Sequence, residues 1–407
     1  MTTTINNKNK KPNVPNLRFP EFEGEWEKCA LENLSTEIGD GIHATPLYDD
    51  NGTYYFVNGN NISEYGITIT PTTQRVTEAE AYRNNANILC SETILLSING
   101  TIGNVALYKG EPIMLGKSAC YINVSTKVNK HYIFHYLMMP KCQFYFTSEL
   151  TGTTIKNLSL KSVRMTNVSL PNLKEQNRIA QLFDAIDERI ATQNKIIDRL
   201  QTLIRGIMVE LQKQGLKNGT WNKFILADVL SERSELNINL HQVFSVSVSK
   251  GVVNQVEYLG RSFSAKDTSK YHVVHYGDIV YTKSPTGSFP YGIVKQSLNH
   301  DNVAVSPLYG VYKPKNFSTG MFLHQYFMSE VNTLNYLHPL IQKGAKNTIN
   351  ITNQRFLENR VAMPVNTDTL SVISQLLRSL NYKIEYQQSL LLQYQKQKQY
   401  LLRQMFI

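Results

Sequence analysis

The chain has 407 residues, of which 42% are hydrophobic, so its length and composition allow two domains with apolar cores. Its formal net charge of +10 favours a polyanionic partner, and nucleic acid, an acidic protein and a membrane surface all fit that charge. No apolar run approaches the ~20 residues that span a bilayer, and the polar N-terminus lacks a signal-peptide core, so we expect a cytoplasmic protein.

The N-terminus from Thr2 to Asn16 is polar and carries Lys8, Lys10 and Lys11, and we predict a flexible tail over residues 1–20. The four cysteines of the chain form no CxxC pair, so we expect free thiols and neither a zinc knuckle nor a redox motif.

The two tryptophans open the same short phrase, 195 residues apart. The first copy reads Gly24-Glu25-Trp26-Glu27-Lys28 and the second reads Gly219-Thr220-Trp221-Asn222-Lys223. The far ends of the copies also match, since Pro171 corresponds to Pro364 and each proline precedes a long stretch with no further proline. This duplication predicts domains over residues 21–171 and 215–364, each followed by a long helix, over residues 172–214 and 365–407. We interpret both tryptophans as core anchors.

Each predicted domain joins two apolar strands through a polar loop. Residues 93–97 precede the loop 98–104, and residues 278–282 precede the loop 283–288. Short Asn, Thr, Ser and Lys side chains in such loops suit phosphates and base edges, although ordinary turn chemistry gives the same composition.

A second loop precedes each long helix, at residues 152–157 and 343–350, and combines glycine with lysine and small polar residues. Such loops suit close approach to a phosphate backbone, although lysines are also commonly only solvated. The predicted DNA-contacting residues of the first copy are Asn99, Thr101, Lys117, Lys156, Asn157, Lys161 and Arg164. Those of the second copy are Lys250, Lys283, Ser284, Thr286, Lys343, Lys346 and Asn347.

Catalytic and metal-binding patterns are weak. His131 and His135 stand four residues apart on a predicted helix, residues 131–139, but the matching helix, residues 321–329, keeps only His324, so we expect no metal site. Residues 110–118 resemble a P-loop but have five residues between the glycines and run toward a strand. We therefore expect a binding protein that is not itself an enzyme.

Both long helices follow a heptad pattern. One seam of the first helix contains Phe183, Ile190 and Ile197, and the seam continues over four heptads, which is typical of a coiled coil. Gln193 and Gln387 interrupt corresponding seams near the middle of each helix. If the helices pair antiparallel, these two amides meet and fix the register; two unrelated polar substitutions at partly exposed positions are the alternative.

The duplicated order resembles the specificity subunit of type I restriction-modification systems. The resemblance rests on the phrases around Trp26 and Trp221, on residues 171–183 followed by a long helix, and on residues 401–406. One departure is that residues 364–368 lack the Glu175-Gln176 pair of the first copy, so the two docking surfaces for partner subunits need not be equal.

The resemblance implies an α+β fold in which two target recognition domains are separated by two helices paired as an antiparallel coiled coil. It implies that each domain reads one half of a bipartite site on double-stranded DNA, and that two methyltransferase subunits dock on the helices. In such complexes the methyltransferase holds S-adenosylmethionine and the restriction subunits use ATP and Mg²⁺, so this chain is expected to carry no cofactor. A coiled-coil adaptor that binds only proteins is the alternative function.

Overall fold

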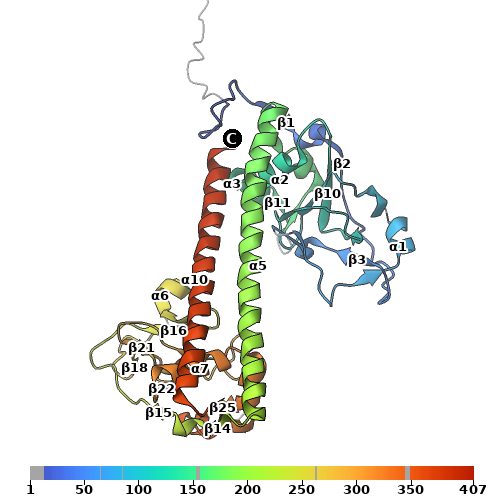
Figure 1. The fold of residues 1–407 in the computed structure, drawn as a ribbon. Coiled ribbons are helices and arrows are strands. Elements are labelled where there is room, and N and C mark those ends of the chain that lie inside the picture. Colours follow the sequence, from blue (N-terminus) through green and yellow to red (C-terminus); the bar gives the residue numbers. More distant parts are fainter. Residues whose placement is uncertain (1–12, 65, 85, 153–155, 262–263, 344–348) are drawn as a thin grey trace, which may run out of the picture. The chain divides into compact units, whose positions relative to one another are not determined.

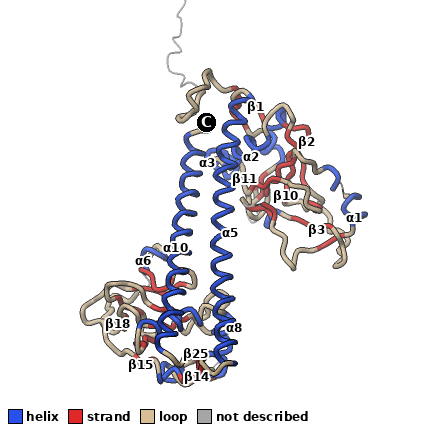
Figure 2. Tube along the Cα trace, viewed as in Figure 1, coloured by secondary structure: helices blue, strands red, loops and turns tan. Residues whose placement is uncertain are grey.

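A computed structural model describes residues 13–407 apart from residues 65, 85, 153–155, 262–263 and 344–348. The chain forms two compact units, residues 1–195 with 389–407 and residues 196–388. Each unit mixes helices and strands and includes part of each long helix (Figures 1 and 2). Among the helices of the described residues, none has the length and apolar character needed to cross a membrane.

The first unit is built on a four-stranded antiparallel sheet. Its strand order is β2 (Ser35–Asp40), β10 (Ala119–Val124), β7 (Thr93–Ser97) and β8 (Val105–Leu107). A three-stranded sheet has the order β6 (Arg75–Val76), β3 (Tyr54–Val57) and β9 (Ile113–Leu115). Two-stranded sheets pair β1 (Glu27–Ala30) with β13 (Asn167–Leu170), β4 (Ile62–Ser63) with β5 (Gly66–Ile67), and β11 (Leu150–Thr151) with β12 (Asn157–Leu158). The short α-helices are α1 (Glu78–Arg83), α2 (Lys130–Met138), α3 (Pro140–Ser148) and α4 (Leu160–Arg164).

Side chains alternate across a strand, so β7 presents residues to both faces of its sheet. Both sets of side chains are buried. Ile94 and Leu96 join the core that contains Trp26, whereas Leu95 joins a second core. Trp26 is 3% exposed and packs edge-on against Tyr132 of α2, with ring centroids 6.2 Å apart. Its burial confirms the interpretation of this tryptophan as a core anchor.

The second unit repeats the strand order of the four-stranded sheet of the first unit. Its four-stranded sheet contains β15 (Leu230–Glu232), β22 (Gly310–Pro314), β19 (Ile279–Tyr281) and β20 (Val294–Gln296). Two-stranded sheets pair β14 (Trp221–Ile225) with β25 (Arg360–Pro364), β16 (Phe244–Ser247) with β17 (Gly251–Asn254), β18 (His272–Val274) with β21 (Val303–Val305), and β23 (Gln342–Lys343) with β24 (Ile349–Asn350). The short α-helices are α6 (Gln255–Leu259), α7 (Phe317–Tyr326), α8 (Glu330–Leu337) and α9 (Asn353–Phe356). Trp221 packs edge-on against Phe322, so the tryptophan anchor is repeated as well.

Two long helices, α5 (Leu173–Lys217) and α10 (Thr367–Gln404), contribute to both units. In the first unit, Phe183 lies near Phe406, and Asp187 of α5 pairs with Lys398 of α10 at 2.5 Å. Residue numbers rise along one helix as they fall along the other, so the helices run antiparallel, as predicted. In the second unit, Ile204 of α5 shares a core with Ile373 of α10.

The glutamines of the seams remain a prediction. The side-chain oxygen of Gln193 is buried and has no hydrogen-bond partner within the described ranges. A buried acceptor of this kind is costly unless a partner reaches it, which agrees with a role in register without testing that role.

The N-terminal residues differ from expectation. We predicted a flexible tail over residues 1–20, but residues 17–19 make defined contacts in the first unit. The Arg18 guanidinium donates to both carboxylate oxygens of Glu175 on α5, at 2.7 and 2.8 Å. The backbone N–H of Leu17 donates to the Gln404 carbonyl of α10. A buried carboxylate needs such a partner, and the sequence pattern of residues 1–20 did not reveal it.

Candidate nucleic-acid interface

Four loops of the first unit converge into what we call the first loop cluster, residues 58–61, 98–104, 116–118 and 156–158. The N–H of Ile98 donates to the Ser118 carbonyl at 3.0 Å, and the N–H of Leu158 donates to the Ile98 carbonyl at 2.9 Å. Asn99 and Asn157 form an isolated β-bridge. The cluster therefore brings together five of the predicted DNA-contacting residues, Asn99, Thr101, Lys117, Lys156 and Asn157.

Gly59 allows the loops to approach one another. A Cβ atom on Gly59 would lie 2.4 Å from Ser97 Oγ and 2.5 Å from the Asn99 carbonyl oxygen, which no side chain tolerates. The Gly59 N–H donates to Ser118 Oγ at 2.8 Å, and the Gly59 carbonyl accepts from Thr101 Oγ1 at 2.6 Å. The cluster is thus held by short hydrogen bonds within itself, which positions its exposed groups before any ligand arrives.

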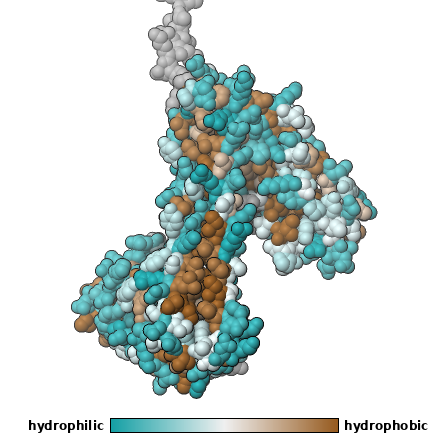
Figure 3. Space-filling model, in the orientation of Figure 1, coloured by the Kyte–Doolittle hydropathy of each residue, from teal (hydrophilic) through white to brown (hydrophobic). Residues whose placement is uncertain are grey.

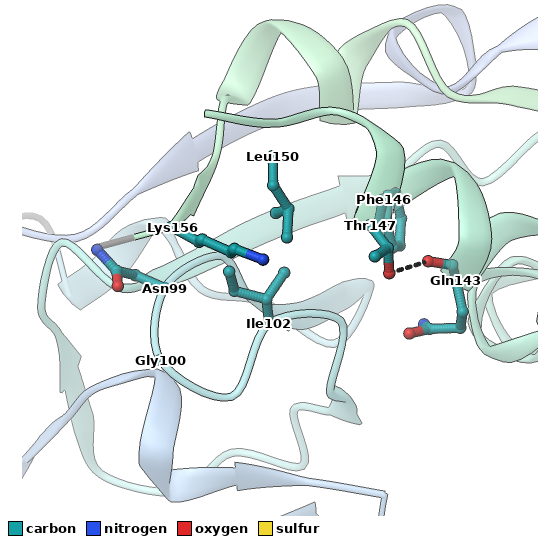
Figure 4. Close-up of a pocket in the computed structure, with 8 residues that line it drawn as sticks. All are labelled: Asn99, Gly100, Ile102, Gln143, Phe146, Thr147, Leu150 and Lys156. Atoms are coloured by element: carbon teal, nitrogen blue, oxygen red, sulfur yellow. Dashed lines mark hydrogen bonds between the residues drawn. The ribbon is translucent and has the colours of Figure 1, made fainter. Parts of the chain in front are cut away.

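A pocket of about 430 Å³ opens beside this cluster (Figure 4). The Lys156 side chain extends over Ile102 toward Leu150, and Asn99 lies at the other end of Lys156. The far wall is formed by α3, where Gln143 donates to the Gly103 carbonyl at 2.8 Å. An ammonium group over an apolar floor, beside a carboxamide, can bind a phosphate or the edge of a base.

The other predicted residues of the first unit lie on α4 and have different surroundings. Arg164 Nη2 donates to the Ile38 carbonyl of β2 at 2.7 Å, so its guanidinium helps to hold that strand. Lys161 is exposed on the same helix. Among these two, only Lys161 keeps a freely solvated charge, so Arg164 is better described as a structural residue.

In the second unit, Lys283, Ser284 and Thr286 lie in a tight turn after β19. Thr286 exchanges backbone hydrogen bonds with Phe289, and its hydroxyl donates to the Ser284 carbonyl at 3.1 Å. Lys283 has a φ of 61°, a backbone conformation that is uncommon outside glycine. Burial lowers the pKa of the Lys283 ammonium, with Glu232 acting in the opposite direction.

The remaining residues of the second unit are described less fully. Lys250 lies in the turn between β16 and β17, where its ammonium stands 5.5 Å from the centre of the Tyr258 ring. The backbone of Lys343 pairs with Ile349 across β23 and β24. The predicted contacts Lys346 and Asn347 lie outside the described residues.

Sequence reasoning missed the contribution of residues 58–61 to the first loop cluster. Asn58 caps a short 3₁₀ helix, and its side chain accepts from Ser118 Oγ at 2.9 Å. Asn104 donates to the Ile62 carbonyl at 2.9 Å. The run Asn58-Gly59-Asn60-Asn61 follows an apolar strand, as does the run that identified residues 98–104, so the same signal was available.

His131 and His135 both contact Asp184 of α5. Their ring nitrogens lie 3.0 and 2.9 Å from the same oxygen, Asp184 Oδ1. No group of three or more metal-ligating side chains occurs within the described ranges. Burial lowers the pKa of His135, against the opposing effect of Asp184. Hydrogen bonds from both histidines hold the pKa of Asp184 well below its usual range, although partial burial opposes them.

Comparison with known proteins gives the same reading of the fold. Residues 23–202 match the type I restriction modification DNA specificity domain. Over these residues the chain is therefore similar to the specificity domains of type I restriction-modification systems.

Relatives of the specificity family match parts of the chain. It is 25% identical over 216 residues to a protein of Methanocaldococcus jannaschii named as the type I restriction enzyme MjaX specificity subunit, covering 51% of this chain and 50% of that protein. It is 24% identical over 115 residues to the EcoBI specificity subunit of Escherichia coli, covering 28% of this chain and 24% of that subunit. The chain thus matches about half the length of the first relative and less of the second.

A crystal structure of a specificity subunit from M. genitalium shares the fold. The TM-score is 0.63 at 14% sequence identity, with 97% of this chain and 99% of that chain covered. The predicted α+β class, with two mixed domains and long helices, is therefore confirmed.

Proposed function

We propose that this chain is the DNA-specificity subunit of a type I restriction-modification complex. Each globular domain reads one half of a bipartite site on double-stranded DNA, and the long helices dock two methyltransferase subunits. The chain works in the cytoplasm and carries no cofactor itself. S-adenosylmethionine belongs to the methyltransferase subunits, and ATP and Mg²⁺ belong to the restriction subunits of the full complex.

One observation carries this proposal: the same sheet order occurs twice, and unlike loops follow the equivalent strands. After β7 the first unit has the Asn-rich loop 98–104, whereas after β19 the second unit has a lysine-containing turn at residues 283–288. A repeated scaffold with different polar loops suits a protein that reads two different half-sites. The binding free energy lost to wrong bases then adds over both half-sites, at about 1–3 kcal/mol for each mismatched base pair.

Lysines of the loops supply affinity and the amides supply discrimination. Lys117 and Lys156 in the first loop cluster can neutralise phosphates, which makes binding sensitive to salt. Asn99 and Asn157, which form a β-bridge in the same cluster, can each present both a donor and an acceptor to adenine. This division matches the usual roles of charged and amide side chains at DNA.

The decisive test is sequencing of methylated bases in cells that carry this chain with its methyltransferase. We expect methyladenine in a motif with two specified parts and an unspecified gap. Cells that lack this chain but keep the methyltransferase provide the control. A continuous motif, or the same motif without this chain, would refute the proposal.

A domain exchange tests which part of the chain reads which half. Replacing residues 215–363 with the equivalent segment of another specificity subunit should change one half of the motif and leave the other half unaltered. If both halves change, the domains do not read independently.

A further inference from the structure

The second unit carries a row of stacked side chains outside the loops that are predicted to contact DNA. We call it the aromatic-arginine ladder, and its members are His300, Tyr276, Phe317, Arg378 and Tyr382. Tyr276 stacks on His300 and on Phe317, with ring centroids 5.4 and 5.2 Å apart and rings nearly parallel. The Arg378 guanidinium lies 5.0 Å from the Phe317 ring centre and 5.3 Å from that of Tyr382.

The charge of the ladder is left uncompensated. Arg378 donates to the hydroxyl groups of Tyr276 and Tyr382, at 3.1 and 2.9 Å. Within the described ranges no carboxylate forms an ion pair with Arg378. Tyr276 and Tyr382 are 39% and 51% exposed, so the ladder is fixed in place and still open to a ligand.

Apolar side chains extend the ladder along α10. Val372, Leu376 and Tyr386 are 66%, 46% and 62% exposed. They lie on the exposed part of the α10 surface, beside the face that buries Ile373 and Leu377. Figure 3 shows apolar side chains gathered along the long helices in this unit. Tyrosine and arginine beside exposed aliphatic groups are typical of the centre of a protein interface.

The equivalent positions of the first unit have opposite chemistry. The sequence repeat aligns Tyr276 with Ser91, Phe317 with Lys130, Arg378 with Asp184 and Tyr382 with Glu188. Lys130 donates to the Ser91 carbonyl, and Asp184 binds two histidines. The first unit therefore has an ionic group where the second unit has the ladder.

The first unit also covers the surface that the second unit leaves bare. Arg178, which aligns with Val372, lies over the ring of Phe19 at 5.3 Å, and the neighbouring Arg18 binds Glu175. The segment that contains Phe19 precedes the first domain. The second domain is instead preceded by α5. An aromatic side chain accompanied by a charge thus already covers this helix face in one of the two copies.

We propose that the ladder and the adjoining face of α10 dock one methyltransferase subunit, through an apolar surface of that subunit that carries a carboxylate. The proposal rests on the proposed function and makes the two docking sites of this chain chemically different. DNA is a poorer occupant, because the exposed aliphatic side chains of α10 beside the ladder suit a protein surface better than a nucleic acid.

The test removes the ladder in the triple variant Tyr276→Ala, Arg378→Ala and Tyr382→Ala. Mass photometry and calorimetry with the methyltransferase subunit would count the bound subunits and measure each affinity. Wild type should bind two subunits, and the variant should bind one with wild-type affinity and the second at least about ten-fold more weakly. Lys223→Gln removes a positive charge from an exposed position of β14 in the same unit and should bind as wild type does.

Further measurements keep each outcome decisive. The single change Tyr382→Ala alters an exposed side chain, so folding is retained, and it should weaken the second site about three- to ten-fold. Two sites of unchanged affinity in both variants would overturn the inference while leaving the proposed function intact. Loss of DNA affinity by the free variant chain, with subunit binding unchanged, would assign the ladder to DNA instead. If wild type binds no methyltransferase subunit, the proposed function fails and the inference fails with it.

Discussion

Neighbouring basic residues of the first unit differ in what they touch, and the difference separates binding from stability. Lys117 is exposed in a turn of the first loop cluster and Lys156 reaches into the pocket beside it, whereas Arg164 holds the Ile38 carbonyl. Sequence composition alone treated all three as equivalent, because nothing local to residue 164 shows that β2 lies against it.

Replacing Lys117 or Lys156 with alanine should lower DNA affinity and reduce the slope of log affinity against log salt by about one unit each. The physical reason is that each lysine releases about one counterion when it meets a phosphate. Arg164→Ala should instead lower the free energy of unfolding and leave the salt slope unaltered. Fluorescence anisotropy over a salt series, with the assembled methyltransferase, measures the slopes; equal slopes for all three variants would refute this assignment.

Buried histidines make the stability of this protein sensitive to acid. Burial, together with a smaller contribution from nearby Lys295, lowers the pKa of His324 to about 3, and its Nδ1 accepts from the Gln296 N–H at 3.0 Å. An unfolded chain binds a proton on this residue near pH 6.5, but the folded chain does not, so stability falls as the pH drops from about 7 toward 3.

His324→Asn should remove this contribution, since an asparagine oxygen can accept the same hydrogen bond without titrating. Urea unfolding at a series of pH values should show a slope lower by up to about 1.4 kcal/mol per pH unit in the variant between pH 6 and pH 4. At pH 8, where the imidazole is neutral in both states, the variant measures only the change in packing. An identical pH slope in both proteins would show that His324 is protonated in the folded state.

The long helices could be predicted from the heptad pattern of their apolar residues, because this pattern is local and repeats over many turns. The short helices were placed less well: α7 begins at Phe317, ahead of the predicted residue 321, because the Asn316 side chain caps it by accepting from the Thr319 N–H. The strand predicted at residues 93–97 matches β7, since a short run with an apolar centre between turn residues has few alternatives. The first loop cluster was only partly predictable, because its hydrogen bonds join residues far apart in sequence.

In the first unit, Asp187 and Lys398 form a polar link between α5 and α10. The second unit has uncharged residues at the equivalent positions. These equivalents are Asn381 and Ile204, and the Lys398 side chain is 7% exposed while that of Asp187 is 31% exposed. Asp187→Asn alone should destabilise the protein by roughly 2 kcal/mol, because the Lys398 ammonium is left buried without its carboxylate.

The double variant Asp187→Asn with Lys398→Ile copies the second unit and should recover most of that loss. Thermal and chemical unfolding of the wild type, both single variants and the double variant form a double-mutant cycle. Additive effects of the two changes would mean that the pair contributes no coupling between the helices.

At the scale of the molecule, α5 and α10 are expected to set the distance between the two half-sites. Deleting one heptad from each helix shortens the helix by about 10 Å at ~1.5 Å per residue. This length corresponds to about three base pairs of DNA. The recognised halves should stay the same while the gap shortens. Sequencing of methylated bases reads both quantities at once, and deletion of four residues from one helix alone, which breaks the seam, serves as the control. An unchanged gap in an active variant would exclude the spacer role.

The first core contains Leu402 of α10 and, just after that helix, Met405 and Phe406, together with Trp26 and Ile179. During synthesis on the ribosome, Trp26 and Ile179 therefore emerge long before the side chains that complete their core. The second unit is one continuous stretch, residues 196–388, and can finish folding earlier. Although domains usually fold in the order in which they are made, here the domain that is translated first is the last to close. A nascent chain holds an unfinished apolar surface until residues 389–407 appear, which makes late truncations far more damaging than the small number of lost residues would imply.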